Sequence, residues 1–141
     1  MSMITRDISK GQLIPLVFGQ DAVAASQTDV QLPTAAGEGS QAVDGYAMPF
    51  DYQVVAVSAS LSAAATAGTL SIGATINGTE AADSTFVVTT ATNAYQRVLR
   101  GKARGAAGSR LGAEITTNSG WDGTTSDLVV TVWVIASLDG I

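Results

Sequence analysis

The most constraining feature of the sequence is the segment 128–135, which is apolar on both faces of a β-strand. Successive side chains of a strand point to opposite faces. One face is aliphatic and consists of Leu128, Val130, Val132 and Val134. The opposite face carries the candidate subunit-interface residues Val129, Thr131, Trp133 and Ile135. A strand of an antiparallel sandwich needs only one apolar face. The second face therefore predicts a cover, and another copy of the chain is the most economical one.

Short β-type segments separated by turn residues fill the rest of the chain after residue 44. Residues 69–76 alternate between apolar and small polar side chains and end at Asn77-Gly78, a dipeptide typical of tight hairpin turns. In residues 53–61, alternation places Val55, Val57, Ala59 and Leu61 on one face. The other expected strands are 46–50, 86–90, 95–100 and 111–117. No window keeps a 3.6-residue apolar period, and only 21–27 allows a helical turn or two. The sequence predicts an all-β fold, an antiparallel β-sandwich.

Composition narrows the function classes. The 141 residues suit one domain and include no Cys and no His, so we expect no disulfide, no metal site and no cofactor. The net charge of −5 argues against nucleic-acid binding, and no apolar run approaches the roughly 18 residues of a membrane span. Charged residues make up only 13% of the chain, against about 25% in an ordinary domain. Either the surface is covered by Thr, Ser and Ala, or much of it is hidden against partners.

The first 44 residues differ from the rest, because they lack the regular strand pattern. We expect residues 1–44 to form an extended N-terminal arm and linker, and residues 45–141 to form the sandwich domain. An apolar island at 13–18 lies within this segment. The candidate docking residues of the arm are Ile4, Leu13, Ile14, Leu16, Val17 and Phe18. If the arm is separate from the sandwich, removal of residues 1–18 should leave a folded domain.

Five of the seven basic residues gather in fourteen positions, and they are Arg97, Arg100, Lys102, Arg104 and Arg110. On a strand, Arg100, Lys102 and Arg104 would share one face. This basic stripe has two interpretations. It is a docking surface for an acidic partner, or it is a solvated edge strand whose like charges discourage aggregation.

Catalytic constellations are weak. Two pairs of carboxylates, Glu80 with Asp83 and Asp122 with Asp127, fall in expected loops, where acidic residues ordinarily form turns. Without His or Cys, the sequence favours a protein that is not an enzyme. Trp121 lies in the polar loop 118–123, where it either stacks on a sugar or packs over the end of the sandwich.

Several short sequence segments resemble segments of tailed-phage structural proteins. They are Tyr46-Ala-Met-Pro-Phe50, Val54-Val-Ala-Val-Ser58, Ala67-Gly-Thr-Leu70, Ile76-Asn-Gly-Thr79 and Asp127-Leu-Val-Val-Thr-Val-Trp-Val134. The resemblance covers about residues 45–138. Proteins of this group have jelly-roll heads like those of the tumour-necrosis-factor and complement-C1q type, and they act as capsid decoration (cement) proteins or head fibres.

This resemblance implies a non-enzymatic virion structural protein. It would bind the major capsid protein as a homotrimer, on the outer capsid surface of a particle assembled in the bacterial cytoplasm. The alternative is a receptor- or glycan-binding head domain of a phage head or tail fibre, in which the loop 118–126 recognises the host. A glycan partner stays open, whereas nucleic acid and membrane are not expected.

Overall fold

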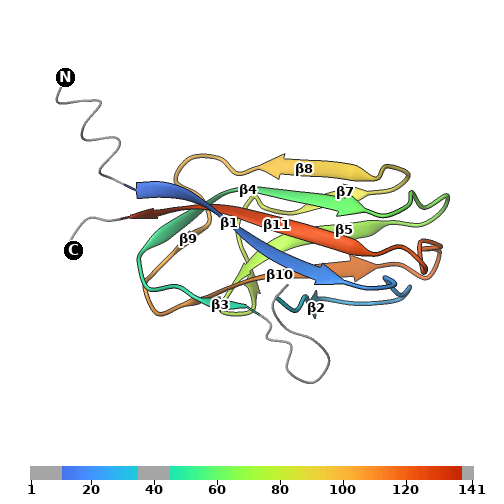
Figure 1. The fold of residues 1–141 in the computed structure, drawn as a ribbon, viewed down its shortest axis with the longest axis horizontal. Helices are drawn as coiled ribbons and strands as arrows, with labels where there is room; N and C mark the ends of the chain where they lie inside the picture. Colours follow the sequence, from blue (N-terminus) through green and yellow to red (C-terminus); the bar gives the residue numbers. More distant parts are fainter. Residues whose placement is uncertain (1–10, 35–44, 138–141) are drawn as a thin grey trace.

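The computed structural model describes residues 11–34 and 45–137, which form two antiparallel β-sheets packed face to face (Figure 1). The described residues contain strands, turns and bends, and no helix, so the one or two helical turns allowed at 21–27 do not form. The predicted all-β sandwich with antiparallel sheets is confirmed.

Sheet A contains the longest strands. Its order is β1 (Gly11–Gln20), β11 (Leu128–Ser137), β4 (Tyr52–Leu61) and β8 (Asn93–Arg97), and the short β9 (Arg104–Gly105) also pairs with β4. The chain's first and last described strands are therefore neighbours, and their pairing runs from Gly11 with Ser137 to Gln20 with Leu128.

Sheet B is built around β10 (Arg110–Thr117) and β5 (Leu70–Ile76). On one side, β10 pairs with β2 (Val30–Gln31) and β3 (Tyr46–Ala47). On the other side, β5 pairs with β6 (Thr79–Glu80) and β7 (Phe86–Val88). The β5–β6 turn has φ of 53° at Asn77 and 81° at Gly78, as expected for an Asn-Gly hairpin.

The pairings are nested along the chain. β1 pairs with β11, β3 with β10, β4 with β8, and β5 with β7, so each pair encloses the next. Between these strands the chain passes repeatedly from one sheet to the other, as from β4 in sheet A to β5 in sheet B. A long hairpin folded over on itself has this pattern of pairs.

The core lies between the sheets and follows the predicted alternation in β11. Leu128, Val130, Val132 and Val134 are almost completely buried. In β5, Leu70, Ile72 and Ala74 face them from the other sheet and are fully buried. The inward face predicted for β11 is confirmed, and so are the inward positions of Leu70, Ile72 and Ala74 in β5. The alternation fails at the end of β5, where Thr75 is buried and Ile76 is only partly buried.

In β4 the predicted alternation fails at one point. Val57, Ala59 and Leu61 are buried as expected, but at the start of the strand Val54 is the fully buried residue and Val55 is not. The register with β11 shifts, because Trp133 pairs with Ala56 whereas the next residue, Val134, pairs with Val54. Val55 is the extra residue of a β-bulge, and a bulge reverses the facing of the residues before it.

Residues 11–34 do not form an arm separate from the sandwich. All ten residues of β1 pair with β11, and Phe18 is fully buried in the core. The Phe18 ring meets Tyr46 edge to face, with 5.4 Å between ring centroids, and Gly19 N donates to Pro33 O at 3.1 Å. The rest of the proposed arm, residues 1–10 and 35–44, lies outside the described residues. Burial of Phe18 is the physical reason for the correction, since an apolar segment this long gains more by packing than by extending into water.

Candidate functional site

The outer face of sheet A combines residues that the sequence places far apart. The pairing of β1 with β11 sets Leu13 beside Ile135, Pro15 beside Trp133, and Val17 beside Thr131. The pairing of β11 with β4 and of β4 with β8 extends the Thr131 row through Ser58 to Tyr95. All four strands therefore contribute to one continuous surface.

This outer face is the main apolar surface of the described residues. The described residues include six exposed large hydrophobic side chains, and four of these lie on the outer face of sheet A. The four are Leu13 (58% exposed), Tyr95 (68%), Val129 (48%) and Ile135 (43%). The described residues of the face include Arg97 and Arg104 at one margin and no carboxylate.

Trp133 lies at the centre of the outer face and is held in place. Its indole Nε1 donates to Ser58 Oγ at 3.1 Å, across the pair of strands β11 and β4. Trp133 and Thr131 are partly buried, while Val129 and Ile135 are exposed. The four candidate interface residues thus share a face as predicted. A tryptophan fixed by a neighbouring hydroxyl is a rigid anchor of the kind that dominates packing between proteins.

The candidate docking residues of β1 divide between its two faces. Phe18 is fully buried, and Ile14 and Leu16 are half-buried residues that pack against the core cluster. Leu13 and Val17 lie on the outer face of sheet A, beside the interface residues. Ile4 lies outside the described residues. As a set, these residues do not form one docking surface, because a strand sends alternate side chains to opposite sides.

The predicted basic stripe is not a strand. β8 ends at Arg97, and the following loop contains Gly101 with φ of 86° and Ala103 with φ of 53°. These left-handed conformations break the period-two facing expected for Arg100, Lys102 and Arg104. Only Arg104 returns to sheet A, in β9, whereas Arg110 begins β10 of sheet B. The cations gather at one end of the sandwich rather than along one strand face.

The four carboxylates singled out in the sequence accept hydrogen bonds from the chain's own amide and hydroxyl groups. Asp122 Oδ1 accepts the amide protons of Thr66 at 2.9 Å and Ala67 at 3.1 Å, and its other oxygen accepts from the Thr66 hydroxyl. These hydrogen bonds lower the pKa of Asp122 below its ordinary value. Asp127 Oδ1 likewise accepts from Ala22 N at 3.0 Å. Asp83 Oδ2 accepts from Leu99 N at 2.9 Å, and Glu80 accepts from Thr85. The contacts of Asp83, Asp122 and Asp127 support their interpretation as turn-forming residues. Glu80 differs, because it lies in β6 and not in the expected loop.

Trp121 packs over the end of the sandwich. It is 3% exposed, and its Nε1 donates to Val23 O at 3.1 Å. Gly68 has φ of 84°, and a Cβ atom there would lie 2.3 Å from the Trp121 backbone. The chain crosses tightly at this point, so the indole is not displayed for stacking on a sugar ring.

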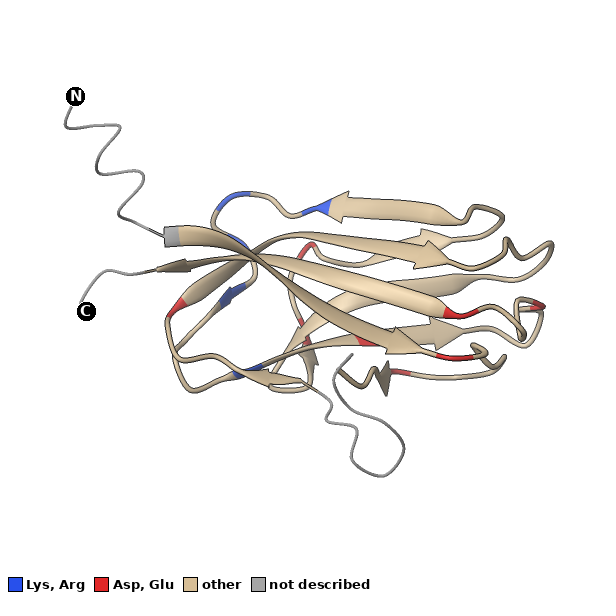
Figure 2. Cartoon of the chain, viewed as in Figure 1, with Lys and Arg blue, Asp and Glu red and all other residues tan. Residues whose placement is uncertain are grey.

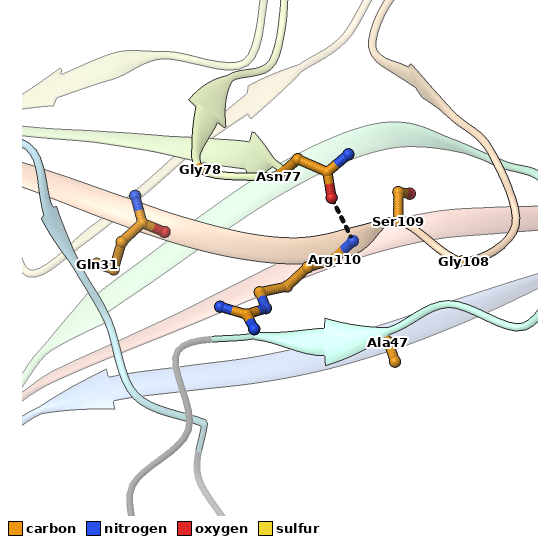
Figure 3. A pocket seen from close by; sticks show the side chains of 7 residues that line it. All are labelled: Gln31, Ala47, Asn77, Gly78, Gly108, Ser109 and Arg110. Carbon is orange, nitrogen blue, oxygen red and sulfur yellow. Dashed lines mark hydrogen bonds between the residues drawn. The ribbon is translucent and has the colours of Figure 1, made fainter.

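A pocket of about 440 Å³ lies on the sheet B side of the molecule (Figure 3). It is lined by Gln31, Ala47, Asn77, Gly78, Gly108, Ser109 and Arg110. Most of its polar groups have partners within the chain. Asn77 Oδ1 accepts from Arg110 N at 2.9 Å, and Ser109 Oγ donates to Ala106 O at 2.6 Å. The Arg110 guanidinium is the cationic group of the pocket. Sequence reasoning did not find this pocket, because four segments that are far apart in the sequence form it.

A buried polar network lies on the outer side of sheet B. Gln31 Nε2 donates to Glu114 Oε2 at 3.2 Å, and Gln31 Oε1 accepts from Thr75 Oγ1 at 3.0 Å. Burial raises the pKa of Glu114, and the carboxylates of Asp29 and Glu80 raise it further. On the core side, Tyr52 Oη donates to Ser109 Oγ at 2.8 Å, and burial raises the pKa of Tyr52. These groups serve structure, since each is matched to a neighbour.

The described ranges were also compared with two simple signatures, a metal-binding cluster and a membrane-spanning helix. Residues 11–34 and 45–137 hold no group of three or more acidic, His or Cys side chains placed to bind a metal ion. No helix in these ranges is long and apolar enough to cross a bilayer. No family model matches this chain, and no curated protein matches its sequence.

Proposed function

We propose that this protein is a non-enzymatic structural subunit of a phage virion, a capsid decoration protein that works as a homotrimer. The observation that carries the proposal is the outer face of sheet A. It holds four of the six exposed large hydrophobic side chains and no carboxylate in its described part. Exposed apolar surface concentrated in this way is typical of interfaces between proteins. Sister copies of the chain are its proposed cover.

The nested strand pairs favour a jelly roll within the sandwich class. A jelly roll is a double-sheet fold of eight strands, and it is common in viral capsid and lectin domains. The four pairs β1·β11, β3·β10, β4·β8 and β5·β7 supply eight strands in that arrangement. This topology agrees with the resemblance of the sequence to phage proteins with jelly-roll heads. It supports a virion role without selecting one, because one fold hosts many functions.

The mechanism of a decoration protein is bridging. A trimer seated between capsomers adds interface area that exists only in the assembled shell. Binding to the assembled state alone then stabilises that state by mass action. The protein would reside on the outer capsid surface, with the major capsid protein as its second partner. No step of this mechanism uses a catalytic group or a cofactor.

The subunit interface is tested by the mass of the native oligomer. Trp133→Asp places a charge at the centre of the outer face, where it would be buried without a partner in the trimer. Light scattering should give a trimer for the natural chain and a monomer or aggregate for the variant. Val87→Asp is the matched control, because Val87 is 58% exposed on β7 of the other sheet. A natural chain that is monomeric, or a trimer that survives Trp133→Asp, contradicts the proposed interface.

Copy number separates the decoration protein from the alternative fibre head. A decoration protein occupies equivalent sites over the whole shell, whereas a fibre is attached at few positions. Quantitative mass spectrometry of purified virions should therefore give tens to hundreds of copies per particle. A count of a few copies would favour the receptor- or glycan-binding head. The buried position of Trp121 removes the aromatic platform that the loop 118–126 would need for a sugar.

A further inference from the structure

The cations of the described chain gather at one end of the long axis of the sandwich, whereas carboxylates occur along its whole length (Figure 2). All five Lys and Arg residues of the described ranges fall within residues 97–110. They lie at the end where β1 begins, β8 ends and β11 ends, which we name the basic end (Figures 1 and 2). The opposite end, where β1 ends and β11 begins, carries Asp21, Asp29, Asp122 and Asp127 and no described cation.

The charged groups of these basic side chains have no hydrogen-bond or ion-pair partner among the described residues. None of the side chains of Arg97, Arg100, Lys102, Arg104 and Arg110 has a hydrogen bond or ion pair to the described residues. The nearby carboxylates of Asp51 and Asp83 accept backbone amide protons instead, from Ala107 at 2.8 Å and Leu99 at 2.9 Å. The positive charge of this end is therefore free to act on a partner.

The loop that presents these charges, residues 98–103, is held firmly at both ends. Val98 is buried, and its N–H donates to Val55 O at 2.9 Å. Ala103 is also buried, and its carbonyl accepts from Val54 N at 3.0 Å. Lys102 N donates to Leu99 O at 3.0 Å across the turn. A fixed backbone displays Arg100 and Lys102 with little loop entropy left to lose on binding.

Leu99 adds an apolar contact in the middle of the charged surface. It is 65% exposed although it is an aliphatic residue in a pinned loop. An apolar centre surrounded by charges is the usual anatomy of a protein–protein interface, where burial gives affinity and the charges give steering and specificity. A loop that only discouraged aggregation would not need the leucine.

We propose that the basic end, centred on Leu99, Arg100 and Lys102, is the surface that docks onto an acidic protein surface of the capsid shell. The inference rests on the proposed function and specifies which end of the subunit faces the shell. In a cyclic trimer every subunit makes the same angle with the axis, so the three basic ends lie on the same side. Three loops then bind one acidic site with added avidity. The acidic ends point away from the shell.

The test uses two variants of equal net charge. Arg100→Ser with Lys102→Ser removes two positive charges from the basic end. Thr124→Glu with Thr125→Glu adds two negative charges to exposed positions at the other end. The probe is empty shells assembled from the major capsid protein encoded in the same genome. Binding is measured by co-sedimentation at low and high salt, with thermal unfolding and light scattering to verify fold and trimer mass.

We expect the loop variant to bind shells at least about tenfold more weakly, with a smaller loss on adding salt, while the control variant binds nearly as the natural chain does. If the loop variant binds shells as tightly as the natural chain does, the basic-end inference is overturned and the proposed function still stands. No shell binding by the natural chain overturns the proposed function and the inference with it. A parallel assay measures binding of the same proteins to single-stranded DNA. A loop variant that loses binding to DNA but keeps shell binding identifies nucleic acid as the partner of this end and also overturns the inference.

Discussion

At the scale of single residues, Glu114 has the most informative environment. The residue is 9% exposed, and its carboxylate accepts a hydrogen bond from Gln31. Burial raises the pKa of this carboxyl, and the nearby charges of Asp29 and Glu80 raise it further. Because the pKa of the folded state lies above that of the unfolded state, the contribution of Glu114 to stability is full in acid. It is lost as the pH rises through the folded-state pKa. At neutral pH the buried charge is a liability.

Glu114→Gln should therefore raise the urea midpoint of unfolding at pH 7, because the amide keeps an acceptor for Gln31 and carries no charge. The gain should shrink near pH 3, below the ordinary glutamate pKa of about 4.3, where the natural carboxyl is mostly protonated in both states. Asp21→Asn is the control, since Asp21 is exposed, and it should change stability by no more than about 0.5 kcal/mol at either pH. A less stable Glu114→Gln variant at pH 7 would show that the charged hydrogen bond outweighs the cost of burial.

At the scale of elements, β1 decides whether the amino-terminal segment is part of the domain. Deleting residues 1–10 leaves every described strand in place and should leave the unfolding free energy nearly unchanged. Deleting residues 1–18 removes most of β1 together with Phe18, whose truncation to Ala alone should cost about 3–5 kcal/mol. We expect the longer deletion to abolish cooperative unfolding in urea. A folded 19–141 fragment would contradict the position of β1 and restore the separate arm.

The same strand shows where sequence reasoning stops. β5 and β11 were predicted from period-two alternation, and the burial of Leu70, Ile72 and Ala74 in β5 and of the aliphatic face of β11 follows from it. β10 was expected as a strand without such a pattern, and its burial does not alternate. β1 was not predicted, because Pro15 interrupts an apolar run that lacks alternation. A proline is tolerated there because, at Pro15, the described pairing of β1 is with β11 alone; the bridge between Phe18 and Thr34 on its other edge lies further along the strand. The bulge at Val55 was equally invisible, since its cause is a register shift against β11.

Only the part of the candidate site that lies on a single strand could be predicted from the sequence. The segment 128–135 was enough to identify Val129, Thr131, Trp133 and Ile135 as one surface. Leu13 and Tyr95, which complete the outer face, join it through the registers of β1 and β8. Register depends on packing between segments more than 30 residues apart, so no local pattern records it. The basic end was likewise predicted as a cluster but not as a loop.

At the scale of the whole molecule, the position of the two chain ends limits how fast the fold can form. Gly11 pairs with Ser137, so the outermost strand pair closes a loop of nearly the whole chain. Closing long loops costs entropy before any contact rewards it, and non-local strand pairs slow folding. A circular permutant that joins Ile141 to Met1 turns β1 and β11 into a local hairpin, with the chain opened between Thr90 and Ala91, both exposed.

This permutant should fold to the same sandwich and refold faster than the natural chain in stopped-flow fluorescence of its two tryptophans. The native strand pairs are all retained, so its circular dichroism spectrum should be unchanged. A second permutant, opened between Gly73 and Ala74 inside β5, is the matched control and should fail to fold, because it cuts a buried strand of sheet B. The Thr90 permutant contains the whole chain, in the order 91–141 followed by 1–90. If it cannot fold, joining the two chain ends is incompatible with the native fold, which contradicts the pairing of β1 with β11. The outer face of sheet A would then lose Leu13, Pro15 and Val17, and with them the surface on which the proposed trimer depends.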